Sequence, residues 1–132
     1  MHRFFLLILL VTSQAALAGQ LSFMSAKALA DHDEASLSGE KDQELIQSQA
    51  PVIQKALSSC LALTTTTNPS GFVVVVELDS SGKVRKTWRN GNSALAVCFE
   101  KVAAEATLVS PPHAPFYSSF EMDFNSDGAG SN

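Results

Sequence analysis

The sequence predicts an α+β domain in which two helices pack on one face of a three-stranded antiparallel sheet, in the order α-β-β-α-β. Three observations carry this prediction. Residues 38–61 and 93–106 each space their apolar side chains as a helix does. Between them, the β-branched run 72–78 leads into a turn that contains glycine, as in a β-hairpin. Each helical segment also carries one cysteine, Cys60 in the first and Cys98 in the second.

The chain begins with the features of a secretory signal peptide. A basic start containing Arg3 precedes the apolar run 4–11, and Ala16-Leu17-Ala18 has the small-x-small pattern of a cleavage site. We therefore expect residues 1–18 to be removed after Ala18 and the mature protein to be exported. The apolar run is much shorter than the roughly 20 residues that span a membrane, so we expect no stable membrane anchor.

The mature chain is of single-domain size and is acidic. The full sequence has 9 Lys and Arg and 13 Asp and Glu residues, and removal of residues 1–18 takes away only Arg3. The remaining 114 residues carry 8 basic and 13 acidic side chains, a net charge of about −5. Such a surface disfavours nucleic acid and anionic membranes as partners.

Two segments are expected to lie outside the domain, which we place at residues 38–124. Residues 19–37 have room for a short helix over 21–30, but they lack an apolar stripe long enough to bury. We expect mainly a flexible N-terminal arm there, and a flexible tail over residues 125–132.

The first helix of the domain starts at Ser38, which can cap it. Pro51 is expected either to kink this helix or to split it, because proline is tolerated only at the first helical position. The turn sequence at residues 68–71 ends the segment. Its predicted apolar face consists of Ile46, Ile53, Leu57, Cys60 and Leu61.

The hairpin follows, with strands over residues 72–78 and 83–89 joined by the turn 79–82. In the return strand we expect Val84 and Trp88 on one side of the sheet. Four basic residues run through this strand: Lys83, Arg85, Lys86 and Arg89.

Ser93 can cap the second helix, and Pro111-Pro112 stops it. The last strand, residues 116–124, alternates strictly, with Phe116 and Phe120 on one side and Tyr117 and Ser119 on the other. A helix of about 14 residues rises roughly 20 Å and returns the chain to the end of the sheet where the second strand began. The first strand is therefore expected in the middle, with the other two as edges. The predicted face of the second helix consists of Leu95, Cys98, Phe99, Val102, Ala103 and Ala106.

Two cysteines in an exported chain are expected to pair. Cys60 and Cys98 lie 38 residues apart, and the loop-closure estimate for a bridge of that span is about 4 kcal/mol. A redox pair is the weaker interpretation, because the spacing is unlike Cys-x-x-Cys.

These pieces, from residue 37 to residue 124, resemble the TonB C-terminal-like family, and most of all the AgmX/PglI-type C-terminal modules with two cysteines in similar places. The resemblance rests on the helix ending in Cys60, the turns at 68–71 and 79–82, and the segment 94–98 that ends in Cys98. It implies a periplasmic module that binds a segment of an envelope protein by adding it to the edge of the last strand. The partner-binding residues expected there are Phe116, Tyr117, Ser118, Ser119, Phe120 and Glu121. The chain departs from the family in lacking a retained membrane anchor and a proline-rich span, so a link to an energy-transducing motor is not implied.

The basic return strand admits two interpretations. Lys and Arg commonly protect an edge strand against aggregation. Alternatively, we expect a docking surface for an acidic partner or a glycan phosphate, formed by Lys83 and Arg85 with Trp88, since an aromatic side chain in a charged patch is a common binding anchor.

No catalytic constellation, cofactor motif or metal site stands out, and we expect no enzyme. His32 lies among acids, which is more typical of a solvated loop than of a metal site, and His113 has no acid or nucleophile near it in sequence.

The sequence favours a periplasmic adaptor that engages a partner segment at the edge strand 116–124. The alternative is a small periplasmic inhibitor or immunity-type protein that blocks an envelope-acting enzyme through a loop, either 80–82 or 111–115. A homodimer through an outer sheet face with Val73 and Val75 is a third possibility.

Overall fold

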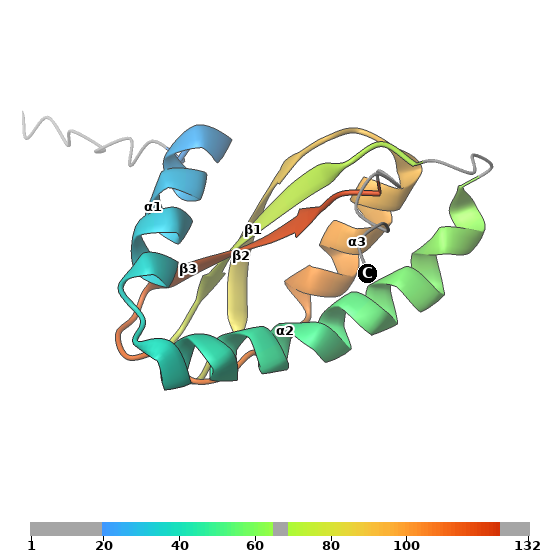
Figure 1. The fold of residues 1–132 in the computed structure, drawn as a ribbon. Coiled ribbons are helices and arrows are strands. Elements are labelled where there is room, and N and C mark those ends of the chain that lie inside the picture. The colour runs from blue at the N-terminus through green and yellow to red at the C-terminus, as the bar shows by residue number, and fades with distance from the viewer. Residues whose placement is uncertain (1–19, 65–68, 125–132) are drawn as a thin grey trace, which may run out of the picture.

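The computed structural model describes residues 20–64 and 69–124. The predicted signal peptide and the predicted tail lie outside these residues. In the described part, a three-stranded sheet is covered on one face by two helices and on the other by a third (Figure 1). The elements are α1 (Phe23–Ala35), α2 (Gly39–Cys60), the 3-10 turn Leu61–Leu63, β1 (Phe72–Leu78), β2 (Val84–Asn90), α3 (Ala94–Ala104) and β3 (Phe116–Met122).

The sheet confirms the predicted topology. Its strand order is β2-β1-β3, and β1 pairs antiparallel with both neighbours. Val74 and Val76 of β1 face α2 and α3, while Val75 faces the opposite side. We call the side that faces α2 and α3 the inner face of the sheet and the other the outer face. β1 is buried on both faces because each face is covered by a helix.

Helix α2 runs as one continuous helix through Pro51, whose side chain is exposed, so the predicted split does not occur. Its buried face matches the predicted one in part, because Cys60 is buried and Ile53 packs against the inner core. Ile46 and Leu61 are 49% and 41% exposed. The sequence carries two overlapping apolar stripes one residue apart, and the helix turns the other one toward the sheet. The residues that α2 buries are Leu45, Val52, Ala56 and Cys60.

Helix α3 confirms the predicted cap and face. The Ser93 side chain accepts a hydrogen bond from the Ala96 N–H at 3.1 Å. Leu95 and Phe99 are buried in the inner core, and the Phe99 ring packs between Phe72 and Phe120. The predicted disulfide joins Cys60, the last residue of α2, to Cys98 in α3.

The return strand contains a β-bulge that was not predicted from the sequence. The register shifts so that Val84 pairs with Leu78, whereas Lys86 pairs with Glu77. The extra residue turns the strand over, and Val84 joins the inner core while Trp88 lies on the outer face. The expectation that Val84 and Trp88 share one side is therefore wrong.

The expectation of a flexible arm over residues 19–37 is also wrong for most of that segment, which forms α1 and packs on the outer face (Figure 1). Its N-terminus is capped by Ser22, whose side chain accepts a hydrogen bond from the Ser25 N–H. The contact depends on small residues: Ala26 and Ala30 lie against Val75 and Tyr117 with no exposed surface of their own. Alanines produce a weak apolar pattern, which explains why the sequence allowed only a short helix over 21–30 and did not indicate that it packs on the sheet.

Within the described residues, none of the helices is both long and apolar enough to cross a membrane.

Candidate binding edge

The predicted partner-binding strand is β3, and its side chains divide between the two faces. Phe116 and Phe120 are buried in the inner core and cannot contact a partner directly. Tyr117 is buried on the outer face beneath α1. Ser118 is buried on the inner side, whereas Glu121 is exposed. A partner can therefore reach this strand mainly through its backbone.

The backbone donors on the free side of β3 are already in use. The N–H of Tyr117 donates to Asp33 Oδ2 at 2.9 Å, and the N–H of Ser119 donates to Glu34 Oε1 at 2.7 Å. Alternate N–H groups of a strand point to the same side, so these are two successive donors of the edge. We call Asp33 and Glu34, the acidic pair at the end of α1, the acidic clamp. Its carboxylate oxygens occupy positions that a neighbouring strand would fill with carbonyl oxygens.

Side chains of α1 and α2 meet at Ser118. Its hydroxyl donates to Glu34 Oε1 at 2.7 Å and accepts a hydrogen bond from Gln49 Nε2 at 2.8 Å. The same Gln49 nitrogen lies 3.4 Å from the carbonyl oxygen of Ser119. Gln49 thus serves an acceptor of the edge while the acidic clamp serves its donors. Burial raises the pKa of Glu34 above its ordinary value, against the hydrogen bonds from Ser119 and Ser118.

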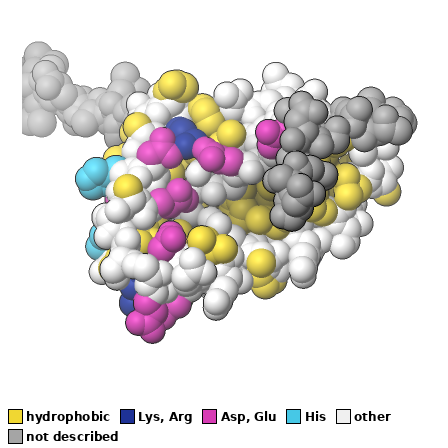
Figure 2. Space-filling model, in the orientation of Figure 1, with side chains coloured by type: hydrophobic (Ala, Val, Ile, Leu, Met, Phe, Trp, Pro, Cys, Tyr) yellow, Lys and Arg dark blue, Asp and Glu magenta, His cyan; other side chains and the backbone are white. Residues whose placement is uncertain are grey.

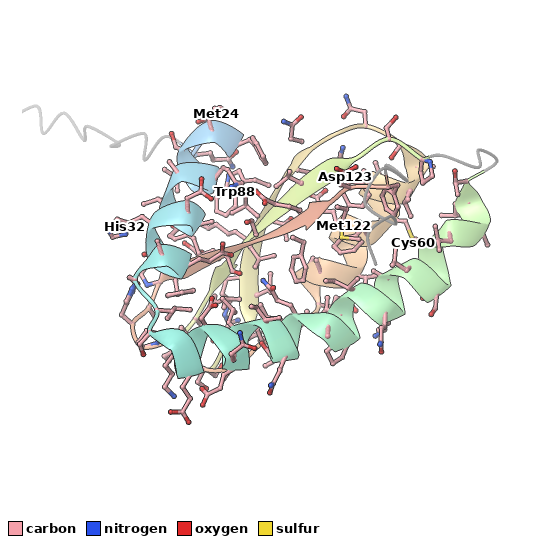
Figure 3. The ribbon with its side chains drawn as sticks, viewed as in Figure 1. Met24, His32, Cys60, Trp88, Met122 and Asp123 are labelled. Atoms are coloured by element: carbon pink, nitrogen blue, oxygen red, sulfur yellow. A yellow bond between two sulfur atoms is a disulfide. The ribbon has the colours of Figure 1, made fainter. Side chains whose placement is uncertain are left out.

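The outer face beside the edge is aromatic. The Trp88 and Tyr117 rings lie 5.9 Å apart, and the Trp88 Nε1–H donates to the carbonyl oxygen of Leu21, just before α1, at 2.8 Å. Figure 3 shows Trp88 beside α1. The Tyr117 hydroxyl donates to Glu77 Oε1 at 2.9 Å, and burial together with this carboxylate raises the pKa of Tyr117 to about 12.

An ion pair ties α1 to the far part of β3. Lys27 Nζ lies 2.7 Å from Glu121 Oε1 and also pairs with Asp31 of its own helix. Hydrogen bonds to Asp31 and Glu121 raise the pKa of Lys27 above its ordinary value. Figure 2 shows acidic side chains gathered over α1 and hydrophobic side chains in the hollow beyond it, on the side of α2 and β3.

The basic strand β2 is not an open docking patch over its whole length. Arg85 pairs with Asp79 Oδ2 at 2.6 Å, and Arg89 Nε lies 3.3 Å from Glu100 Oε1 on α3. The Trp88 side chain is partly buried on the outer face beside α1. Of the predicted docking residues, Lys83 is exposed and lies directly before β2. Arg85, although exposed, is engaged with Asp79.

The two loops of the alternative hypothesis lie at one end of the sheet, because Leu78 pairs with Phe116 and the loops 79–83 and 111–115 adjoin these residues. Asp79 organises the first loop: its Oδ1 accepts hydrogen bonds from the side chain and N–H of Ser81 and from the N–H of Lys83. At the opposite end of the sheet, beyond α1, there is a shallow recess of about 530 Å³. Its lining residues are 71–73, 90, 91 and 121–123.

The two histidines in the described residues, His32 and His113, both lie near Asp33. His113 Nε2 lies 3.7 Å from Asp33 Oδ1, and its Nδ1 lies 3.2 Å from the carbonyl oxygen of Pro115. His32 projects away from the sheet (Figure 3), with Nδ1 3.4 Å from Asp33. In the described part of the chain, no group of three or more His, Cys, Asp or Glu side chains is placed to hold a metal ion.

Sequence reasoning placed the edge but missed the residues that occupy it: Asp33, Glu34 and Gln49. A signal was present in the Ser22 cap, followed by a helix-compatible run that ends in the acidic pair. What the sequence does not reveal is that the end of this helix lies against a strand more than 80 residues away.

Comparisons of the chain with protein-family models, with curated proteins and with solved structures find no match.

Proposed function

We propose that this is an exported, periplasmic protein-binding module that accepts an extended segment of an envelope protein as an additional strand at the β3 edge. Export agrees with the Cys60–Cys98 disulfide and with the predicted signal peptide. Strand addition is a recurrent mode of peptide recognition in which main-chain hydrogen bonds supply much of the affinity.

One observation carries the proposal: the outward donors of β3 are satisfied by side-chain carboxylates and not by a backbone strand. Because only side chains occupy these N–H groups, the backbone of β3 could still pair with another strand once the side chains move away. The other edge is protected differently, because Lys83 forms a bridge with Thr107 and the Val84 N–H donates to the carbonyl oxygen of Ala106. Part of that edge is thus covered by backbone, which no side-chain movement can clear.

The proposal also defines how selectivity arises. Phe116 and Phe120 hold the strand in the core and offer the partner no contact. Affinity then comes from the backbone of residues 117–121, and selectivity from the outer face around Tyr117 and Trp88. Such a site suits a segment that is extended and alternates apolar with polar side chains.

The experiment is an affinity capture from a periplasmic extract with the mature protein and two variants at one position. Ser119→Pro removes the N–H that an added strand would need, whereas Ser119→Ala removes only the hydroxyl. Circular dichroism and the intact disulfide check that both variants are folded. We expect a specific partner that binds the wild type and Ser119→Ala, with at least a tenfold loss for Ser119→Pro, since a charge-free backbone hydrogen bond and the register beyond it are lost together.

A partner that binds Ser119→Pro as tightly as Ser119→Ala would contradict strand addition at β3. Mapping by substitution at Ser81 and Pro112 would then decide whether the loops bind it, as the inhibitor hypothesis requires.

A further inference from the structure

We infer that α1 is a displaceable guard of the β3 edge: the acidic clamp occupies the backbone donors of Tyr117 and Ser119 and must leave them before a partner strand can bind. The inference rests on the proposed strand addition, because it names what regulates that same edge. The occupant of the opened edge is an extended segment with alternating apolar side chains.

The acidic clamp and a partner strand need the same backbone N–H groups of β3. Each edge N–H has a single hydrogen, and those of Tyr117 and Ser119 already donate to Asp33 and Glu34 at 2.9 and 2.7 Å. An incoming carbonyl oxygen needs about the same position and distance. Gln49 stands likewise where an incoming N–H would reach the carbonyl oxygen of Ser119. The partner and the acidic clamp therefore cannot occupy this stretch of the edge together.

Helix α1 has few large apolar contacts with the sheet. The side chains it buries fully are those of Ala26 and Ala30, which are small, while Met24 is 73% exposed (Figure 3). The Phe23 side chain adds a partly buried apolar contact at the start of the helix. The other attachments are polar: the acidic clamp, the Lys27–Glu121 ion pair and the bond from Trp88 to Leu21. Polar attachments of this kind can be exchanged for those of a partner or of water at small net cost.

Burial of the acidic clamp disfavours the ionised form of its carboxylates. Glu34 is partly buried, and its raised pKa shows that burial opposes the ionised form. Asp33 is almost completely buried. Release of α1 returns both carboxylates to water, which offsets part of the loss of their hydrogen bonds.

Movement of α1 away from the sheet would expose part of the outer face. Three residues, 36–38, join α1 to α2, and only Leu37 among them packs on the inner core. Movement about this connection uncovers Val75, Trp88 and Tyr117 on the outer face. Of these residues, Tyr117 lies on β3 itself, so a strand added beside β3 can pack its outward-facing side chains against the Tyr117 ring.

The test compares two variants with the same substitution at neighbouring positions of α1. Ala30→Glu places a charge where the helix meets the sheet, whereas Ala28→Glu changes an exposed position of the same helix. The probe is a synthetic peptide with the chain's own sequence 116–124, whose alternation suits pairing with β3. A peptide with proline at its centre serves as the control. Binding is followed by the emission of Trp88, the one tryptophan of the chain.

Two results are expected. The amide hydrogens of Tyr117 and Ser119 exchange with solvent faster in Ala30→Glu than in Ala28→Glu or the wild type. The peptide also binds Ala30→Glu at least about tenfold more tightly than either, because a site that is open in less than a tenth of the molecules has its apparent affinity reduced by that fraction.

Equal exchange and equal affinity in the two variants would overturn the guard, even if Ser119→Pro still loses its partner. Faster exchange without any strand or partner binding would instead overturn strand addition, and the guard with it. Should Ala30→Glu fail to fold, the double substitution Asp33→Ala and Glu34→Ala takes its place, since it removes both acceptors and leaves the apolar contacts of α1 intact.

Discussion

At the scale of single residues, Gly82 is a position where two backbone segments come too close for a side chain. It has a φ of 84°, and a Cβ there would lie 2.2 Å from the carbonyl oxygen of Leu108. The same carbonyl group belongs to a residue whose N–H donates to the Gly82 carbonyl oxygen at 2.8 Å. The turn thus anchors the connection between α3 and β3.

We expect Gly82→Ala to lower the free energy of unfolding by at least about 2 kcal/mol, from the positive φ and the clash together. Gly39→Ala is the matched control, because a Cβ at Gly39 meets nothing within 4 Å and the residue begins α2. That change is expected to be neutral or to stabilise by up to about 1 kcal/mol. Urea denaturation measures both, and a similar loss in the two variants would refute the role given to the turn.

The raised pKa of Glu34 makes the stability of the protein depend on pH. Its folded-state pKa is raised, first by burial, so the folded protein holds a proton on Glu34 over a pH range in which the unfolded chain has released it. In that range, which begins at about 4.5, stability falls as the pH rises. We expect the free energy of unfolding of the wild type, relative to that of Glu34→Gln, to increase as the pH is lowered from 7 to 4. Denaturation curves at several pH values measure it, and a difference independent of pH would contradict the assignment.

At the scale of elements, the docking of α1 can be read from Tyr117, the single tyrosine of the chain. Burial and Glu77 raise its pKa to about 12. In the folded state we expect the phenol to titrate near pH 12 by absorbance, and in Ala30→Glu at a lower pH, closer to the ordinary value of 10. Between these two values the protein loses stability as the pH rises, because the unfolded chain releases the proton first. An unchanged midpoint in Ala30→Glu would mean that α1 does not shield this face.

The disulfide joins two elements of the inner layer, the end of α2 and the middle of α3. We expect the double substitution Cys60→Ala and Cys98→Ala to lower stability by about 4 kcal/mol under oxidising conditions, because the bridge closes a loop of 38 residues in the unfolded chain. A reductant should bring the wild type to a similarly low value and leave the variant unchanged. Full stability of the variant would contradict this account.

The elements also show where sequence reasoning succeeds and where it stops. The strand run at residues 72–78 and the caps and stripe of α3 carry strong local signals, and these elements form as predicted. The choice between Leu45 and Ile46 as the buried position of α2 is different, because both stripes exist and only the shape of the sheet decides. The bulge in β2 likewise depends on its register against β1.

At the scale of the whole molecule, the sequence predicted one layer of helices and the structure has two. The inner layer is visible in the sequence because it buries large side chains such as Phe99 and Leu95. The outer layer is held by alanines and by an acidic pair, which in a sequence are typical of a solvated helix. The candidate edge was thus predictable as a strand, whereas its occupation by Asp33 and Glu34 required the three-dimensional structure.

The outer layer changes the interpretation of the surface. The sequence suggested a homodimer through an outer face with Val73 and Val75, and without α1 that face would be open. With α1 in place, that face is covered within the monomer. A partner or a second copy can use it only after the helix has moved.

The most direct test of this account is hydrogen exchange of the wild-type protein at low denaturant concentrations, followed residue by residue by NMR. We predict that the amides of Tyr117 and Ser119 exchange together with those of α1, through an opening that needs less free energy than exchange of the β1 amides. Exchange of Tyr117 and Ser119 only through global unfolding, at the same free energy as β1, would contradict a displaceable α1 and with it the guarded binding edge.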